Sequence, residues 1–146
     1  FNADLQAASR TPLFIAVDEE GGAVARLANH PAFDLPQYES AVAVGASGDP
    51  ADACAMGQTI GAYLKEYGFN MDFAPDADVN TNPDNPIIGT RAFSSDAATA
   101  AEMAAAAADG LRTGGSSDRA AHGGPYRSAD GCSYRGPYRS TDGGSN

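Results

Sequence analysis

The chain has 146 residues, and its 19 acidic against 9 basic side chains give a formal net charge of −10 at pH 7. This length suits one ordinary domain, and the acidity argues against a nucleic-acid partner, because basic side chains would be needed to neutralise its phosphates. No apolar run approaches the roughly 18 residues of a membrane span, so we expect no membrane partner. The 2 cysteines form no CxxC pair and no zinc-ligand spacing.

An apolar stretch at residues 13–17 follows a short helical pattern over residues 2–9. Its unbroken run of Leu, Phe, Ile, Ala and Val predicts a strand buried on both faces, as in a parallel sheet. Asp18, Glu19 and Glu20 come directly after it, and two glycines that allow a sharp turn come next. Because ligands of α/β folds bind at the carboxyl ends of the strands, these acids are candidate functional groups.

A long helix is predicted over residues 50–67, with Asp49 placed to cap it, Pro50 at its first position and Gly68 at its end. Its packed face consists of apolar residues at helical spacing: Ala53, Met56, Ile60, Leu64 and Tyr67. Residues 69–74 then alternate apolar and polar side chains, which is the period of a strand. Strand, helix and strand form a βαβ unit, whose parallel strands bring their carboxyl ends to one edge.

The last predicted helix begins at Asp96 and continues to about residue 111, with alanine giving it high helix propensity. Met103, Ala107 and Leu111 form its packed stripe. A pair of glycines at residues 114–115 ends it.

Residues 116–146 differ sharply from the rest of the chain. They contain no Leu, Ile, Val, Phe or Met and carry 3 acidic and 4 basic residues, whereas residues 1–115 carry 16 acidic and 5 basic ones. Residues 124–131 recur almost unchanged as residues 136–143. Such a segment buries too little apolar surface to offset the entropy of ordering, so we expect a disordered, low-complexity tail. Its abrupt start indicates a frameshift, a gene-model error or a fusion.

Two separate motifs resemble the glycoside hydrolase family 3 N-terminal domain. Residues 13–22 are similar to the family's apolar strand followed by Asp-x-Glu-Gly-Gly, and residues 70–75, 78–83 and 88–94 are similar to a second motif at about the family's spacing. The resemblance covers about residues 1–115. It implies a (β/α)₈ TIM barrel, which needs about 250 residues. We therefore expect an α/β fold that is a partial barrel, cut from a longer chain.

The resemblance implies sugar-binding roles for Asp18, Arg26 and Arg91. Asp18 matches the residue that holds the sugar in the innermost subsite, and its carboxylate can accept charge-assisted hydrogen bonds from hydroxyls. Arg26 and Arg91 match arginines that face the sugar, and a guanidinium is a fork of donors suited to adjacent hydroxyls. The alternatives are a solvated loop acid, a surface arginine, and a salt bridge between Arg91 and a nearby aspartate. Ala23 departs from the family, which usually has an arginine there.

Two other acidic features do not predict a site. Glu19 and Glu20 are adjacent at a strand end, so their side chains should point apart and not flank one glycosidic bond. Residues 76–80 begin like a calcium loop, but Thr81 and Ile87 occupy the positions that require Gly and Glu. We expect no metal and no cofactor.

The resemblance implies a retaining glycosidase, most like the β-N-acetylhexosaminidases, whose substrate is a carbohydrate with a terminal N-acetylhexosamine. In that subgroup the aspartate nucleophile comes from a later strand, and a histidine acid/base follows a Lys-His motif. Neither is in this chain, so we assign no catalytic residue and expect the chain alone to be inactive. Two alternatives stay open: an inert or merely sugar-binding truncation product, and a non-enzymatic interaction protein that uses the Tyr/Arg repeats of the tail.

Overall fold

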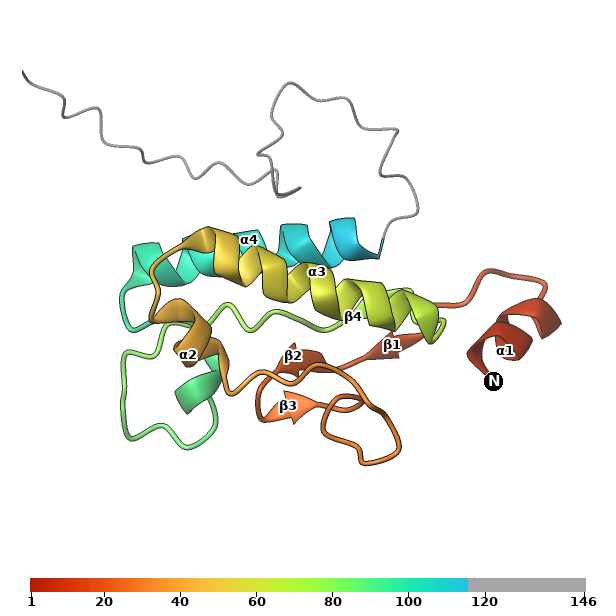
Figure 1. Ribbon diagram of the computed structural model, residues 1–146, viewed down its shortest axis with the longest axis horizontal. Helices are drawn as coiled ribbons and strands as arrows, with labels where there is room; N and C mark the ends of the chain where they lie inside the picture. Colours follow the sequence, from red (N-terminus) through yellow and green to blue (C-terminus); the bar gives the residue numbers. More distant parts are fainter. Residues whose placement is uncertain (116–146) are drawn as a thin grey trace, which may run out of the picture.

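The computed structural model describes residues 1–115; the predicted disordered tail, residues 116–146, lies outside the described residues. The elements follow in the order α1 (Asn2–Ala8), β1 (Ala16–Val17), β2 (Glu19–Gly21), β3 (Val24–Ala25), α2 (Ala41–Gly45), α3 (Pro50–Glu66), β4 (Met71–Asp72), the 3-10 helix η1 (Gly89–Arg91) and α4 (Ala97–Gly114). The two long helices α3 and α4 lie together on one side of the short strands (Figure 1). Neither helix is both long and apolar enough to span a bilayer, nor is any other helix within residues 1–115.

The parallel strand pair expected from the βαβ pattern is present. Ala16 lies opposite Met71, and Val17 lies opposite Asp72, in a parallel ladder between β1 and β4. Backbone hydrogen bonds from Met71 and Phe73 to carbonyls of the first strand segment hold the register. The carboxyl ends of both strands therefore meet at one edge, where the acidic segments begin.

The expectation that residues 13–17 are buried on both faces is wrong. Phe14 is 87% exposed and Ala16 is exposed, whereas Val17 packs against the core. The reason is that β1 has a single sheet neighbour among the described residues, and the helices cover only one face of the pair. An apolar run predicts a strand, but its burial depends on neighbours elsewhere in the chain.

The residues after Asp18 form a hairpin, where the sequence predicted only a glycine-containing loop. β2 and β3 pair antiparallel with an irregular register between Glu19 and Gly21. Gly21 and Gly22 have φ values of +84° and +65°, a left-handed conformation that glycine adopts without strain. This hairpin turns the chain back beneath α3.

The two long helices begin where the sequence predicts. Asp49 accepts a hydrogen bond from the backbone N–H of Ala51 at the start of α3, and Asp96 accepts one from Thr99 at the start of α4. The short helix α2, capped by Ser40, was not predicted. On α3 the predicted face is buried except at its last position, where Tyr67 is 39% exposed.

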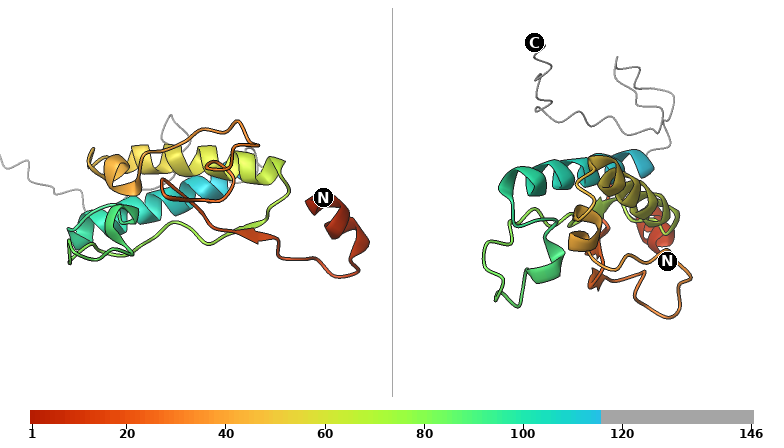
Figure 2. Two further views of the ribbon diagram at one scale, coloured as in Figure 1. Left: turned by 90° about the horizontal axis from the view of Figure 1, so that it is seen from below. Right: turned by 60° about the vertical axis from the view of Figure 1, so that its left-hand side comes forward.

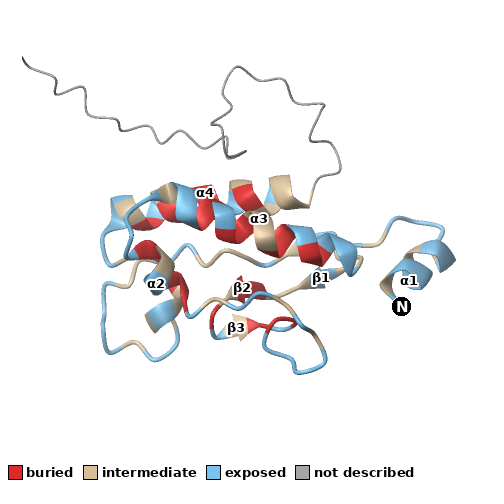
Figure 3. Ribbon diagram, viewed as in Figure 1, coloured by how far each residue is buried: buried red, intermediate tan, exposed pale blue. Residues whose placement is uncertain are grey.

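Helices α3 and α4 pack through glycines, so their backbones approach closely. A Cβ added at any of these glycines would collide with a backbone carbonyl of the facing helix; they are Gly57 and Gly61 on α3, and Gly110 and Gly114 on α4. The facing sides of the two helices are the most buried part of the molecule (Figure 3). The larger buried side chains of this core are Met56, Ile60, Leu64, Phe93 and Met103.

Helix α1 lies at one end of the molecule, beyond β1 and away from the packed helices (Figure 2). None of its residues is buried. The Asn2 side-chain amide donates to the carbonyl of Tyr67 at 3.0 Å, and the Gln6 side-chain oxygen accepts from the N–H of Leu13 at 3.2 Å. These polar contacts, and not apolar packing, attach α1 to the rest.

We expect Gly110→Ala to destabilise the chain by on the order of 2 kcal/mol, because the new methyl group has to push α3 and α4 apart. At an exposed helical site the same change would stabilise by about 1 kcal/mol. Urea unfolding, monitored by circular dichroism, measures the difference in stability between the variant and the parent. Ala62→Gly, at an exposed position of α3, is the control and should cost only about 1 kcal/mol. A Gly110→Ala chain as stable as the parent would contradict the close helix packing.

Candidate functional site

The candidate site is the edge where the carboxyl ends of β1 and β4 meet. Asp18 and Glu20 follow β1, and Asp72 is the last residue of β4. The long loop after β4 then returns with Asp76 and, through η1, with Arg91. Charged groups from two distant parts of the sequence are therefore collected on one edge.

Glu19 is the structural centre of this edge. It is fully buried, and its carboxylate accepts hydrogen bonds from the backbone N–H groups of Leu27 and Ala28, at 2.8 and 2.9 Å, and from the Tyr63 hydroxyl at 2.9 Å. Burial, followed by the hydrogen bond to Glu19, raises the pKa of the Tyr63 hydroxyl well above its usual value, so it remains a donor. A buried carboxylate with three donors is a structural anchor, not a free acid.

Arg91 is held by two acidic side chains. Its Nε and Nη2 each donate to one carboxylate oxygen of Glu20 at 2.8 Å, and Nη2 also lies 3.4 Å from Oδ2 of Asp76. Nη1 donates to the carbonyl of Ile87 at 3.2 Å. The hydrogen bond to Glu20 raises the pKa of Arg91 further above its usual range, so the guanidinium stays charged. Its side chain is still 27% exposed.

Asp18 and Arg26 form a looser pair at the open side of the hairpin. Arg26 Nη2 lies 3.7 Å from Asp18 Oδ2, and the two side chains are 63% and 49% exposed. The backbone N–H of Arg26 also donates to the Asp18 carbonyl at 3.3 Å, which fixes the spacing of the two residues. An exposed pair of this kind contributes little to stability. Because both side chains are exposed, both charged groups are accessible to a ligand.

Asp72 is the unusual acid of the site. Its Oδ1 accepts the backbone N–H of Glu19 at 3.0 Å, while its Oδ2 is buried with no hydrogen-bond partner among residues 1–115. Burial raises the pKa of Asp72 to about 7, and the charges of Glu19, Asp18 and Glu20 add to that effect, against the lowering effect of the Glu19 N–H.

The structure brings together Asp18 and Arg26 directly, and it pairs Arg91 with Glu20, two residues beyond Asp18. The salt bridge that was the alternative for Arg91 is present, to Asp76 and above all to Glu20. Glu19 and Glu20 point apart as expected, one to α3 and one to Arg91.

Sequence reasoning missed the roles of Glu19, Glu20 and Asp72. Their partners lie 44 to 71 positions away in the chain for the Glu19–Tyr63, Glu19–Asp72 and Glu20–Arg91 contacts. No local spacing could reveal such pairs. The only available signal was the unusual density of acids after two strands.

The edge thus offers a half-exposed carboxylate and two guanidinium groups, one of them held rigidly. Such groups suit a neutral, polyhydroxylated ligand, since each can bond hydroxyls in a fixed direction. No group of three or more His, Cys, Asp or Glu side chains within residues 1–115 has the arrangement of a metal site.

Comparison with known proteins shows which family the chain resembles. Residues 2–131 match the glycosyl hydrolase family 3 N-terminal domain. This match extends past residue 115, where the resemblance of the motifs was expected to end. The chain is 41% identical over 93 residues to β-hexosaminidase A of Pseudoalteromonas piscicida, covering 64% of this chain and 16% of that protein. It is 36% identical over 114 residues to the β-hexosaminidase LpqI of Mycobacterium tuberculosis, covering 71% and 26%.

The structure is similar to a solved glycoside hydrolase family 3 β-N-acetylglucosaminidase from Paenibacillus sp. str. FPU-7. The TM-score is 0.70 at 36% sequence identity, over 76% of this chain and 21% of that one. The chain therefore spans about a quarter or less of the length of these three proteins.

We expect Glu19→Ala to destabilise the chain by about 3 kcal/mol or more, because it leaves two buried N–H groups and the Tyr63 hydroxyl without an acceptor. Tyr63→Phe removes one of the three bonds and should cost about 1 kcal/mol. Chemical unfolding measures both. The matched control is Glu39→Ala, at an exposed position; an equal loss of stability in Glu19→Ala and Glu39→Ala would refute the anchoring role.

The raised pKa of Asp72 predicts a stability that falls with rising pH. In the folded state the carboxyl of Asp72 holds its proton with a pKa of about 7, whereas the ordinary pKa of an aspartate is 3.8. Its contribution is therefore fully present below pH 4 and is lost as the pH rises through 7, with a slope of at most about 1.4 kcal/mol per pH unit. Thermal unfolding of the parent and of Asp72→Asn between pH 5 and 8 tests this. In Asp72→Asn the stability should fall less between pH 5 and 8 than in the parent. The same pH dependence in both proteins would contradict the raised pKa of Asp72.

Proposed function

The chain belongs to the glycosyl hydrolase family 3 N-terminal domain family, and from this premise we propose that it is part of the sugar-binding rim of a retaining glycosidase. The proposed substrate is a β-linked carbohydrate with a terminal N-acetylhexosamine. The relatives named β-hexosaminidase and β-N-acetylglucosaminidase support that choice of sugar. Its fold is proposed to be part of a (β/α)₈ barrel, of which β1–α3–β4–α4 are two successive units.

One observation carries the proposal: the Arg91 guanidinium is fixed by the bidentate bond to Glu20 at the same strand edge as the exposed Asp18–Arg26 pair. A guanidinium held before the ligand arrives loses less freedom on binding, which favours recognition of a sugar hydroxyl or an acetamido carbonyl. We assign Asp18, Arg26 and Arg91 as sugar contacts. In this assignment Asp18 accepts from sugar hydroxyls, and the two arginines donate.

The proposed role for this chain is binding, without a complete reaction. Retaining hydrolysis needs one group to attack the anomeric carbon and another to move a proton at the leaving oxygen. Glu19 is buried and already accepts three hydrogen bonds, and Glu20 is bonded to Arg91 through both carboxylate oxygens. We therefore assign neither of them as nucleophile or acid/base, and the rest of the catalytic machinery is proposed to come from outside this chain.

The purified chain is expected to bind N-acetylglucosamine weakly and to leave an aryl β-N-acetylglucosaminide unhydrolysed. Ligand-observed NMR titration measures the binding, and release of the aryl alcohol measures turnover. Asp18→Asn and Arg91→Lys should each weaken binding by about tenfold, since each loses a charge-assisted or bidentate hydrogen bond worth about 1.5 kcal/mol or more.

The matched controls are Asp34→Asn and Arg10→Lys, two exposed positions outside the site, and both should bind as the parent does. Equal weakening in the controls, or no binding by a folded parent, would refute the sugar site. Turnover that Asp18→Ala abolishes would mean that the catalytic groups are in this chain after all.

A further inference from the structure

Arg91 is surrounded by more negative charge than it can neutralise. Both carboxylate oxygens of Glu20 accept hydrogen bonds from its guanidinium at 2.8 Å, and Oδ2 of Asp76 lies 3.4 Å from Nη2. The pKa of this arginine is raised by the hydrogen bond to Glu20 and then by the charges of that residue, of Asp76 and of Asp78. One guanidinium therefore faces three carboxylates, and the group is negative overall.

Asp76 contributes its charge to this group without a hydrogen bond to Arg91. Its side chain is only 4% exposed, and its buried Oδ2 has no hydrogen-bond partner within residues 1–115. Its Oδ1 accepts the backbone N–H of Asp78 at 2.8 Å, which fixes the carboxylate at the start of the long loop after β4. A buried carboxylate acts on its neighbours with less screening than an exposed one.

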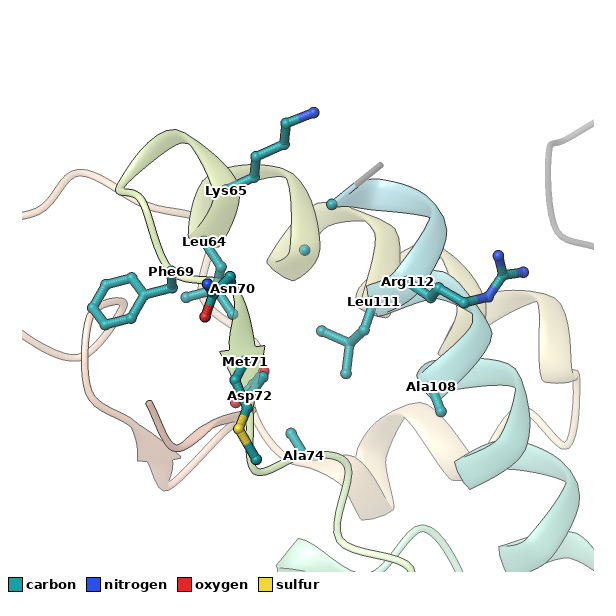
Figure 4. A pocket seen from close by; sticks show the side chains of 12 residues that line it. Leu64, Lys65, Phe69, Asn70, Met71, Asp72, Ala74, Ala108, Leu111 and Arg112 are labelled. Carbon is teal, nitrogen blue, oxygen red and sulfur yellow. The ribbon is translucent and has the colours of Figure 1, made fainter. Parts of the chain in front are cut away.

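Basic side chains near the strand edge do not balance these acids. Arg26 lies 3.7 Å from Oδ2 of Asp18, so its charge is already matched by that acid. Lys65 on α3 and Arg112 on α4 line a pocket beside β4, and Figure 4 shows their charged ends directed away from Asp72. The surplus of negative charge around Arg91 is therefore not balanced within the described part of the chain.

This arrangement changes what the arginine can recognise. An arginine without acidic partners attracts carboxylates and phosphates, with which it forms bidentate pairs. In Arg91 the two nitrogens that form such a pair, Nε and Nη2, are bonded to Glu20. Nη1 carries a further N–H beside the one that donates to the carbonyl of Ile87, and a single donor suits one neutral hydroxyl or carbonyl oxygen.

We infer that Asp76 determines specificity: its buried charge, added to that of Glu20, makes the rim accept neutral sugars and reject sugars that carry a carboxylate or a phosphate. Asp76 is a positioning residue, because it acts through Arg91 and its buried Oδ2 does not reach the ligand. This role rests on the proposed sugar binding at Arg91, and it adds the class of sugar that the site excludes.

The test is ligand-observed NMR titration of the full chain with two matched sugars at low ionic strength. One is the methyl β-glycoside of N-acetylglucosamine, and the other is the corresponding uronic acid, in which a carboxylate replaces the hydroxymethyl group. The parent should bind the acid about tenfold more weakly than the neutral sugar, because the rim repels its charge. Added sodium chloride should bring the two affinities closer, since salt screens that repulsion.

Asp76→Asn and Asp84→Asn form a matched pair of variants, because both replace an acid of the same loop by its amide and Asp84 is exposed. Asp76→Asn keeps an acceptor for the N–H of Asp78. It should reduce the preference for the neutral sugar from about tenfold to about threefold, whereas Asp84→Asn should leave the preference at about tenfold.

A parent that binds both sugars equally well overturns the inference, and so does an unchanged preference in the folded Asp76→Asn chain. If circular dichroism shows that Asp76→Asn does not fold, the parent decides: a preference for the neutral sugar that does not fall with added salt overturns the inference. A folded parent that binds neither sugar refutes the sugar site itself, and this role of Asp76 with it.

Discussion

The buried carboxylate of Glu19 is the interaction on which the rest of this structure depends. It accepts donors from the turn after β3 and from α3, and the N–H of the same residue donates to Asp72 at the end of β4. One residue thus joins the hairpin, the long helix and the second strand of the parallel pair. A buried charge is costly unless its hydrogen bonds are complete, so the position of each of these elements is tied to the others. With Glu19 held in this way, the side chain of the adjacent Glu20 points the other way and bonds Arg91.

The acids gathered at the strand edge repel one another. Arg91 offsets this repulsion for the two buried side chains of Glu20 and Asp76. Asp76 is almost completely buried and Glu20 nearly so, and both lie against Arg91. Asp72 has no such partner, and its raised pKa is the result. The most exposed charges of the edge are those of Asp18 and Arg26, whereas the side chain of Arg91 is 27% exposed. Glu19 and Glu20 therefore position other groups, whereas the exposed carboxylate of Asp18 can contact a ligand.

The same chain is well packed on one side and open on the other. The glycines of α3 and α4 let the two helices form a tight core from small side chains, whereas Phe14 and Phe73 on the strands are 87% and 57% exposed. Both strands are edges among the described residues. Exposed apolar side chains next to unpaired strand edges are the features by which proteins recruit further strands. The helix seam explains why residues 1–115 can hold a defined arrangement although the sheet is so narrow.

The sequence by itself determined the local elements and the family. Asp49, Pro50 and Gly68 mark α3 because caps and helix breakers act within a few residues, and Asp96 marks α4 in the same way. The order of strand and helix was enough to predict that β1 and β4 are parallel. Roles for Asp18, Arg26 and Arg91 in sugar binding were also predicted from motifs, and they stay predictions.

Only the tertiary structure decided which acids are anchors and which are exposed. Glu19 and Glu20 are adjacent and chemically alike, but one meets Tyr63 and the other meets Arg91, and both partners come from distant segments. The burial of residues 13–17 was mispredicted for the same reason, because it depends on strands and helices that an apolar run cannot specify. Hydrogen bonding and burial at this edge are properties of long-range contacts, whereas capping and periodicity are properties of the local sequence.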